Sequence, residues 1–431
     1  MSDLGNESGG AADWERRLSD IMRMMRETSE QTDPQAMVAA YSRHVRSMVP
    51  VDAFVSLSRR DLDPPKYRIT RYSGWTEKIN PWQQKDRLPI LEGGLLGKLL
   101  YDGEPTIIDE LELPPDDPAA EYLAGQRSLM AVPHLEGGKT VNMFVSARTT
   151  PGAFDRERFP DMVWTSILFG RSTHNLVLAE QVRAAYNLVD RELQVVGDIQ
   201  RSLLPAQLPE VPGLKLAAHY QTSQRAGGDY YDFFPLKDGR WGIMIADVSG
   251  HGTPAAVMMA VTHSIAHMFP GASAPPSEML NFVGRHLANR YTNHVGAFVT
   301  AFYGIYDPRT RELEYSSAGH NPPRLKRCGG GPISVLDGAA SFPLGIAADV
   351  SYENATIGLH SGDQIIFYTD GITEATDPWD QQFGVARLDA AIAPCRDDPK
   401  EVIAALLDSL SAFTAGQPIT DDRTLVAAMV E

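Results

Sequence analysis

Cysteine is nearly absent: the 431 residues include only Cys328 and Cys395. These two residues lie far apart in the sequence, and neither belongs to a CxxC motif or to a Cys/His metal-binding pattern, which excludes the usual sequence signature of a structural zinc site. No histidine cluster offers a comparable zinc site. We therefore expect two free thiols in a reducing cytosol.

Long apolar runs are absent as well. No segment approaches the roughly 18 consecutive apolar residues that a membrane span requires. Residues 1–12 are acidic and rich in glycine and serine, and they lack the apolar stretch of a signal peptide. We therefore expect a cytoplasmic protein with no membrane partner and with a disordered tail over residues 1–12.

Positive charge is scarce, because 39 Lys and Arg face 55 Asp and Glu and the net charge is −16. Such a balance disfavours a protein that binds nucleic acid or an anionic membrane surface through a basic patch. The chain is also too long for one typical core, although its 43% hydrophobic residues suit globular folding. The composition predicts two or more globular domains without a nucleic-acid partner.

The first half of the chain alternates between helical and extended patterns. Apolar residues recur at helical spacing from Asp13 to Thr28, and Pro34 precedes a second helix. Further elements are expected in this order: strands over 51–58 and 67–72, a short helix over 93–100, strands over 106–108, 128–133 and 141–148, and a helix over 154–169. The acidic segment 109–118 is expected to be a loop, and 136–139 a hairpin turn.

This order resembles a GAF domain, a sensing module of signalling proteins that binds small molecules or partners. The resemblance is carried by residues 95–109, by 128–132 with the following hairpin, and by Phe154-Asp155 before the exit helix. It implies a GAF-like α/β sensor domain over 13–171 with an unknown ligand or partner. Trp75 and Trp82 either line a pocket or pack and lie at the surface.

A helical connector is predicted over 172–211. Its apolar residues recur with 4-3-4-3 spacing and then a full heptad, and they are Val182, Tyr186, Val189, Leu193, Val196 and Leu203. Such a narrow stripe is typical of a coiled coil, here of a parallel homodimer, although one helix packed on a domain would also produce it. Pro205 and Pro209 end the helix.

Four aspartates in the second half of the chain share one setting, since each adjoins a predicted strand: Asp229, Asp247, Asp370 and Asp421. A single aspartate at a strand end is more often a turn former than a ligand. Four together provide the carboxylates that hard cations such as Mg²⁺ or Mn²⁺ prefer, and they would repel one another without cations. The pattern favours a site for two metal ions.

Six ordered motifs in residues 212–431 resemble the SpoIIE-like branch of the metal-dependent protein phosphatases, the PPM family. The motifs are Gly227 to Phe233 (GGDYYDF), Asp247 to Gly252 (DVSGHG), Ala318 to Pro323 (AGHNPP), Pro343 to Gly345 (PLG), Thr369 to Gly371 (TDG) and Asp421 to Thr424 (DDRT). The resemblance implies an α-β-β-α sandwich, so that the whole chain belongs to the α+β class.

The resemblance also implies a metal site and a reaction. Asp247 would bridge two Mn²⁺ or Mg²⁺ ions, Asp370 and Asp421 would complete one ligand set, and Asp229 with the carbonyl of Val248 would serve the other. A metal-activated water would then attack a phosphoserine or phosphothreonine. In this branch the usual substrate is a STAS-domain anti-anti-sigma protein, the output of partner switching, and the GAF domain and dimeric connector would regulate the reaction.

Some positions depart from the wider family. Ser249 stands where eukaryotic members commonly carry a histidine that acts as general acid, and His251 follows two residues later. Arg225 is either a phosphate-binding arginine or a surface residue. His320 is expected to shape a loop.

Two further acids and two other functions complete the interpretation. Asp232 and Asp422 are expected to be structural or solvated, and Asp422 could also contact a metal. Because a general acid and a phosphate arginine are not identified, a catalytically silent scaffold that binds a phosphoprotein is the alternative to the phosphatase. A ligand-controlled dimerisation module is the third interpretation.

Overall fold

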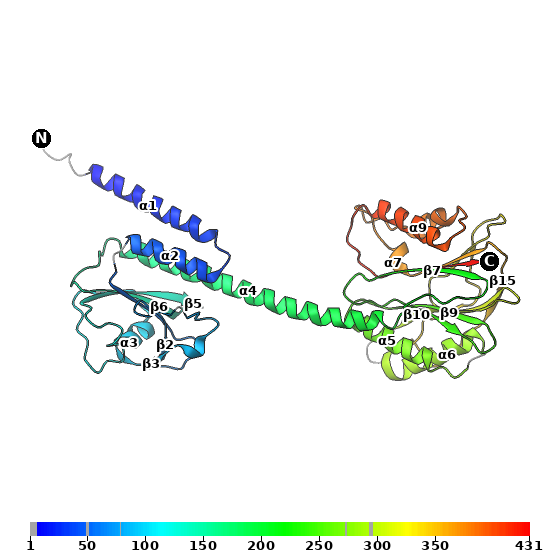
Figure 1. Cartoon of the computed structure of the whole chain (residues 1–431), viewed down its shortest axis with the longest axis horizontal. Helices are drawn as coiled ribbons and strands as arrows, with labels where there is room; N and C mark the ends of the chain where they lie inside the picture. The colour runs from blue at the N-terminus through cyan, green and yellow to red at the C-terminus, as the bar shows by residue number, and fades with distance from the viewer. Residues whose placement is uncertain (1–6, 49–50, 78, 272–273, 293–295) are drawn as a thin grey trace. The chain divides into compact units, whose positions relative to one another are not determined.

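The computed structural model describes residues 7–48, 51–77, 79–271, 274–292 and 296–431. The chain divides into two compact units, Met1–Ala185 and Tyr186–Glu431 (Figure 1). Across the described ranges, none of the helices combines the length and the hydropathy needed to cross a membrane.

The N-terminal unit is built on one antiparallel sheet of six strands in the order β3-β2-β1-β6-β5-β4. The strands are β1 Ala53–Ser58, β2 Lys66–Tyr72, β3 Ile90–Glu92, β4 Thr106–Ile108, β5 Ser128–Glu136 and β6 Lys139–Arg148. The helices are α1 Glu7–Ser29, α2 Pro34–Met48, η1 Lys85–Arg87, α3 Gly94–Asp102 and α4 Phe159–Arg201. Strand β3 and η1 were not expected from the sequence.

Both faces of this sheet are buried, which β5 illustrates. Leu129 and Ala131 belong to the core beneath α3, whereas Met130 and Val132 belong to the core beneath α1, α2 and α4. Successive side chains of a strand point to opposite faces, so one strand supplies both cores. The elements follow the order expected from the sequence, and the GAF-like assignment stays a prediction.

The C-terminal unit is a sandwich of two sheets covered by helices on both outer faces (Figure 1). One sheet runs β14-β11-β10-β9-β8 with β15 beside β11, and the other runs β13-β12-β16-β17-β7. Helices α5 and α6 contact the first sheet, and α7 and α9 contact the second. This arrangement confirms the expected α-β-β-α architecture.

The strands and helices of this unit have the following bounds. The strands are β7 Leu214–Gln221, β8 Tyr230–Pro235, β9 Trp241–Val248, β10 Val299–Asp307, β11 Glu312–Ala318, β12 Arg324–Lys326, β13 Ser334–Val335, β14 Ala340–Ser341, β15 Ala355–Gly358, β16 Gln364–Tyr368 and β17 Arg423–Val430. The helices are α5 Thr253–His267, α6 Pro276–Leu287, η2 Ala288–Thr292, α7 Asp370–Thr373, α8 Gly384–Ile392 and α9 Pro399–Thr414. Strands β12 to β15 are short and were not predicted.

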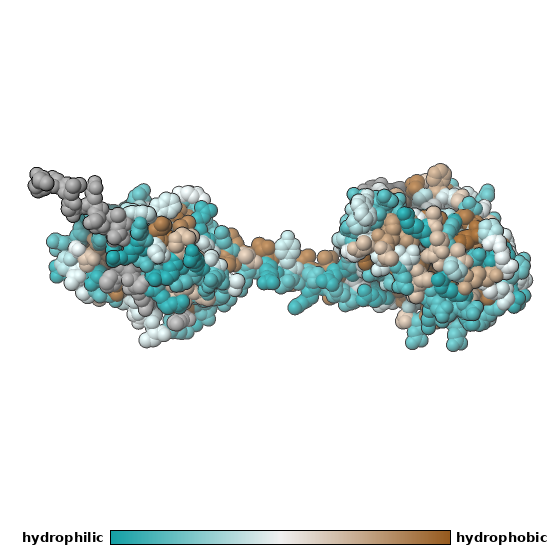
Figure 2. Space-filling view, turned by 90° about the horizontal axis from the view of Figure 1, so that it is seen from above, coloured by the Kyte–Doolittle hydropathy of each residue, from teal (hydrophilic) through white to brown (hydrophobic). Residues whose placement is uncertain are grey.

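Helix α4 runs without a break for 43 residues and ends at Arg201, four residues before Pro205. Three residues of the predicted seam are exposed on it: Val182 by 52%, Tyr186 by 72% and Val189 by 53%. Figure 2 shows hydrophobic residues along this helix. Exposed apolar side chains at heptad spacing suit a second helix, and the homodimer stays a prediction.

Two expectations were wrong. Residues 7–12 lie in α1 rather than in a disordered tail, while residues 1–6 lie outside the described residues. The two cysteines are not free thiols, because a disulfide joins Cys328 and Cys395 with 5.7 Å between their Cα atoms. Cys328 follows β12 and Cys395 follows α8. Arg324 of β12 contacts Asp389 of α8, so the fold brings together two cysteines that are 67 residues apart in the sequence.

Candidate functional site

The four predicted acids lie at strand ends of both sheets of the C-terminal unit. Asp229 directly precedes β8 and Asp247 lies near the end of β9, in one sheet. Asp370 begins α7 and is separated from the end of β16 by Thr369 alone, and Asp421 lies just before β17, in the other sheet. The sandwich therefore brings together carboxylates that are up to 192 residues apart, from Asp229 to Asp421.

Each of the four carboxyl groups has a raised pKa, and burial is the largest cause for each. The pKa of Asp247 is raised further by the charges of the other three acids, and that of Asp229 by Asp370. Burial and the nearby Asp421 raise the pKa of Asp370 to about 6. The four acids thus form one electrostatic group whose members oppose one another's ionisation.

No arginine or lysine neutralises this group among the residues that the structure describes. The hydroxyls of Thr369 and Thr424 donate to the same Asp229 oxygen at 2.8 and 2.6 Å. The interaction with His251 lowers the pKa of Asp421, but burial raises it by more. A buried set of oxygen donors without a counter-charge fits hard divalent cations such as Mg²⁺ or Mn²⁺.

Asp422 holds the loop that carries Asp229. It is buried and accepts hydrogen bonds from the backbone N–H groups of Gly228 at 2.6 Å and Ser223 at 2.7 Å. A Cβ atom on Gly227 would lie 2.1 Å from an Asp422 oxygen, and a Cβ on Gly371 would lie 1.9 Å from the Asp422 carbonyl oxygen. Both positions therefore require glycine, because a side chain there would collide with Asp422. Asp422 has a structural role, which is one of the roles expected for it from the sequence.

The end of α4 contacts the same loop within the C-terminal unit. The side-chain amide of Gln200 both donates to the carbonyl of Gly227 and accepts from its N–H group, the latter at 2.9 Å. Gly197 makes this approach possible, because a Cβ there would lie 2.0 Å from the carbonyl oxygen of Arg225. Gln200 was not predicted from the sequence, since a single glutamine in a helix has no distinguishing pattern.

The remaining sequence candidates have other partners. Arg225 is exposed, and its guanidinium pairs with Asp190 of α4 at 2.9 and 3.0 Å, so it is engaged away from the four acids. The Ser249 hydroxyl accepts from the N–H of Phe298 at 2.9 Å. His320 is buried beside Thr300, and burial lowers its pKa to about 4, which suits the expected role in shaping a loop.

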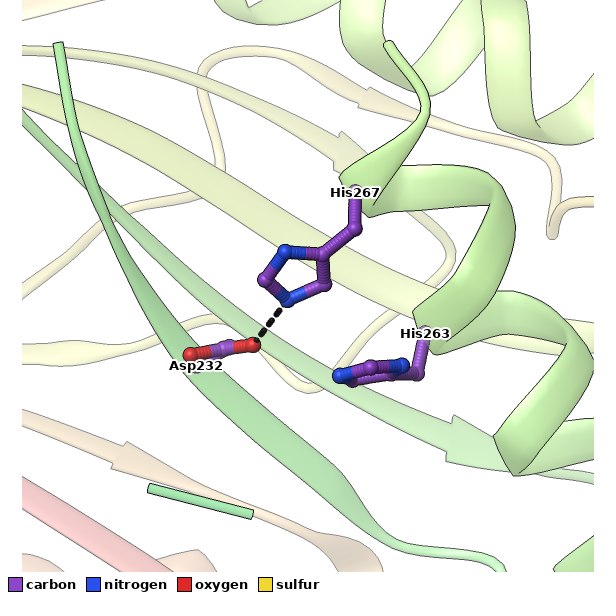
Figure 3. A group of neighbouring side chains, drawn as sticks. All are labelled: Asp232, His263 and His267. Carbon is purple, nitrogen blue, oxygen red and sulfur yellow. Dashed lines mark hydrogen bonds and ion pairs between the residues drawn. The ribbon is translucent and has the colours of Figure 1, made fainter. Parts of the chain in front are cut away.

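A second cluster of ligand-type residues lies on the outer side of β8. Figure 3 shows His263 and His267 of α5 facing Asp232, and donor atoms of the three residues lie within 4.8 Å of one another. His267 contacts an Asp232 oxygen at 2.7 Å, and the Tyr230 hydroxyl donates to the same oxygen at 2.7 Å. The cluster holds α5 against β8, and its His-x₃-His spacing is one that transition metals use.

This cluster was not predicted from the sequence. No histidine site of zinc type was expected, and Asp232 was expected to be structural or solvated. Asp232 is buried with hydrogen-bond partners, so its role is structural rather than solvated. The signal that could have revealed the cluster is the spacing of His263 and His267 on the helix that follows β9.

Comparisons with known proteins fall mainly on the C-terminal unit. Residues 237–431 match the family model described as Stage II sporulation protein E (SpoIIE). Protein IcfG of Synechocystis sp. is 26% identical over 289 residues, which are 61% of this chain and 45% of that protein. Phosphoserine phosphatase RsbU of Bacillus subtilis is 29% identical over 195 residues, which are 45% of this chain and 57% of that protein. The chain thus spans about half the length of these curated relatives.

A solved structure shows the same fold. The SiaA-PP2C domain of Pseudomonas aeruginosa superposes with a TM-score of 0.51 at 22% identity, and the match covers 57% of this chain and 99% of that domain. At this identity the similarity establishes the fold alone. It agrees with the sandwich described above and gives no information on the N-terminal unit.

Proposed function

We propose that the chain is a metal-dependent phosphoserine and phosphothreonine protein phosphatase of bacterial signalling, because residues 237–431 match the family model described as Stage II sporulation protein E (SpoIIE). The observation that supports this most is the group of four carboxylates that has no lysine or arginine partner among the described residues. Such a group has no evident structural benefit, because burying uncompensated acids costs stability. It becomes favourable when divalent cations bind.

In this proposal Asp370 and Asp421 would hold one Mn²⁺ or Mg²⁺ ion, Asp229 with the carbonyl of Val248 would hold the other, and Asp247 would serve both. When bound, the ions supply a nucleophilic water at neutral pH and neutralise phosphate charge.

The chain's own residues fix this ligand set. Thr369 and Thr424 orient one oxygen of Asp229 by donating to it, and Asp422 fixes the backbone before Asp229. No side chain is assigned as general acid, because Ser249 is engaged with Phe298.

The substrate that we propose is a phosphorylated STAS-domain anti-anti-sigma protein. RsbU, to which this chain is similar, is described as a phosphoserine phosphatase, and the resemblance to the SpoIIE-like branch points to partner switching. The chain itself carries a net charge of −16. An acidic enzyme can hold a phosphoprotein through its bound cations, so the proposal needs no basic surface.

Regulation would reach the site through α4. Its C-terminal end contacts the Asp229 loop through Gln200 and Gly197, and Asp190 of the same helix pairs with Arg225 in that loop. A change in the packing of a dimeric connector would alter these contacts and so the position of Asp229. We propose that the GAF-like unit acts on this two-state element.

The decisive experiment is hydrolysis of para-nitrophenyl phosphate and of a phosphoserine peptide by the purified chain, with and without millimolar Mn²⁺. We expect turnover that requires Mn²⁺ and falls at least ~10³-fold in Asp247→Asn, because several kcal/mol of transition-state stabilisation depend on the cations. The exposed Asp349→Asn is the matched control and should retain full activity.

Two results would contradict the phosphatase. Equal turnover by Asp247→Asn and the parent chain would remove this site from the reaction. Binding of the phosphopeptide in Mn²⁺ without any hydrolysis would establish the silent scaffold instead. Thermal melting of both variants shows whether each is folded.

A further inference from the structure

The N-terminal unit contains a cavity of about 590 Å³ on the side of the sheet that faces α2 and α4. This volume lies within the range of roughly 300–1,000 Å³ that is typical of small-molecule sites. Its floor is formed by β1 and β2, its walls include Tyr41 of α2 and Phe169 of α4, and Trp82 lies at its edge. None of these residues belongs to the four-acid site, which lies in the other unit.

A β-bulge places two arginines on the floor of this cavity. Strand β1 pairs with β2 so that Ser56 opposes Arg71 and Leu57 opposes Ile69, which leaves Thr70 as an extra residue. Bulges of this kind redirect side chains at functional sites. Arg68 and Arg71 both line the cavity as a result, whereas Ile69 is packed into the core on the opposite face.

Neither arginine has a carboxylate partner among the described residues. Arg71 is partly buried, and burial lowers its pKa to about 10. Its closest polar contact is the Gln35 side-chain oxygen at 3.5 Å, and its guanidinium lies 5.5 Å from the centroid of the Trp82 ring. The Nε of Arg68 is buried without a hydrogen-bond partner in the part of the chain that the structure describes.

The acids that line the cavity are already neutralised. Glu136 pairs with Arg60, and Asp61 pairs with Lys85 at 3.3 Å. The cavity is therefore positive within an acidic protein, and its two central guanidinium groups lack counter-ions. A buried donor without a partner costs stability, so the arrangement favours an anionic guest.

The lining also contains apolar and aromatic side chains. The rings of Tyr41 and Phe169 stack with centroids 3.9 Å apart, and those of Phe54 and Phe144 lie 5.9 Å apart. A small inorganic anion would leave this surface uncovered. The lining therefore matches a guest that has an apolar body as well as a charged group.

We propose that this cavity binds a small organic anion, with its carboxylate or phosphate group on Arg68 and Arg71 and its apolar body against Tyr41 and Phe169. The planar guanidinium groups suit such anions, because each can donate two parallel hydrogen bonds to one of them. This ligand would be the signal of the regulated phosphatase proposed above. Only that regulatory consequence rests on the proposed function; binding itself does not.

The test measures binding of 1-naphthoate and 1-naphthylphosphonate to the full chain by calorimetry, with 1-naphthamide as the neutral analogue. The phosphonate replaces a phosphate ester that a phosphatase would hydrolyse, and the two anions distinguish the two head groups. We expect one of them to bind with one-to-one stoichiometry, and the amide to bind at least ~10-fold more weakly because it lacks charge-assisted hydrogen bonds.

Substitution assigns the site. Arg68→Gln and Arg71→Gln should each weaken binding of the anion at least ~10-fold, because each removes a hydrogen bond to a charged group. Arg87→Gln is the matched control: Arg87 is exposed in the same unit, pairs with Glu77 at 2.9 Å and does not line the cavity. It should bind as the parent chain does.

The melting temperature distinguishes a ligand-binding role of Arg71 from a structural one. If Arg71 serves a ligand, Arg71→Leu should raise the melting temperature of the ligand-free chain while it weakens binding, because an unpaired charge is removed. A lowered melting temperature together with unchanged anion affinity would assign Arg71 to packing and overturn the proposal.

Three further outcomes are decisive. Failure of both anions to bind at millimolar concentration, equal binding of the amide, or equal affinity in Arg71→Gln and Arg87→Gln would each overturn the cavity proposal. None of these results would affect Mn²⁺-dependent phosphatase activity, which is measured separately. Binding at the cavity without phosphatase activity would support the cavity and refute the proposed function.

Discussion

The two units of this chain place unpaired charges of opposite sign in their interiors. The N-terminal unit directs Arg68 and Arg71 into a cavity whose acids are already paired. The C-terminal unit gathers four carboxylates that raise one another's pKa. In both places the described part of the chain provides no partner, which is what a site for an ion or ligand from solution requires.

A buried ion pair in the C-terminal unit shows how these two sites differ from charges that have a partner. Arg324 is buried, and its guanidinium contacts both oxygens of Asp389, with Nε at 2.8 Å. That pair joins β12 to α8 and is complete without a ligand. Buried charge by itself therefore does not mark a functional site in this protein, whereas buried charge without a partner distinguishes the two regions that we propose to bind ligands.

Among substitutions that leave the charge of the acid site unchanged, the largest effect is expected from one that changes the shape of the site. In Gly227→Ala the new Cβ would collide with Asp422, which fixes the loop before Asp229. We expect the Mn²⁺-dependent rate to fall ~100-fold, because misplacement of ligands by about 1 Å can cost that much. Gly329→Ala is the control, since nothing lies within 4 Å of its Cβ. Equal rates in the two variants would show that loop geometry is unimportant.

Ligand addition should distinguish the two units by their melting transitions. At about 100 times the dissociation constant, a ligand stabilises the folded state by ~2.7 kcal/mol. Mn²⁺ should raise the melting transition of the C-terminal unit, and the organic anion should raise that of the N-terminal unit. Calorimetric scans with each ligand alone and with both will check this. Loss of the Mn²⁺ effect in Asp247→Asn, but not in Arg71→Gln, would establish that the sites are distinct, and the reverse pattern would contradict the comparison.

The pH dependence of the N-terminal unit gives a smaller effect. Burial lowers the pKa of His134, which lines the cavity, from 6.5 to about 4. The unfolded chain therefore binds more protons between these values, so the free energy of unfolding should rise from pH 4 to 6.5 and then level off, by a total of about 3 kcal/mol. The melting transition that responds to the anion provides the measurement. His134→Gln should flatten the curve, whereas an unchanged slope would assign it to other groups.

The smallest effect is expected at the connector. Gln200→Ala removes the paired hydrogen bonds to Gly227, each worth ~1 kcal/mol, and should change the Mn²⁺ concentration needed for half-maximal activity several-fold. Gln207→Ala is the control, since Gln207 is exposed beyond the end of α4. If both variants behave as the parent chain does, α4 does not influence the acid site.

Much of the C-terminal unit could be predicted from the sequence. The six ordered motifs identified the four acids, each beside a predicted strand. Short edge strands such as β13 and β14, with two residues each, were not predicted because they carry no periodicity. Gln200, the His263 and His267 cluster and the disulfide were also missed, since each depends on contacts between distant segments.

The sequence by itself determined the order of helices and strands, the acidic balance and the residues able to bind cations, because periodicity and residue chemistry are local properties. The tertiary structure decided which charges lack partners. Arg68 and Arg71 face one cavity because of a bulge in the pairing of β1 with β2. Asp422 fixes the loop before Asp229 because it directly precedes β17 and lies beside Gly228. Whether a charge is paired depends on long-range packing, and local sequence contains no measure of that packing.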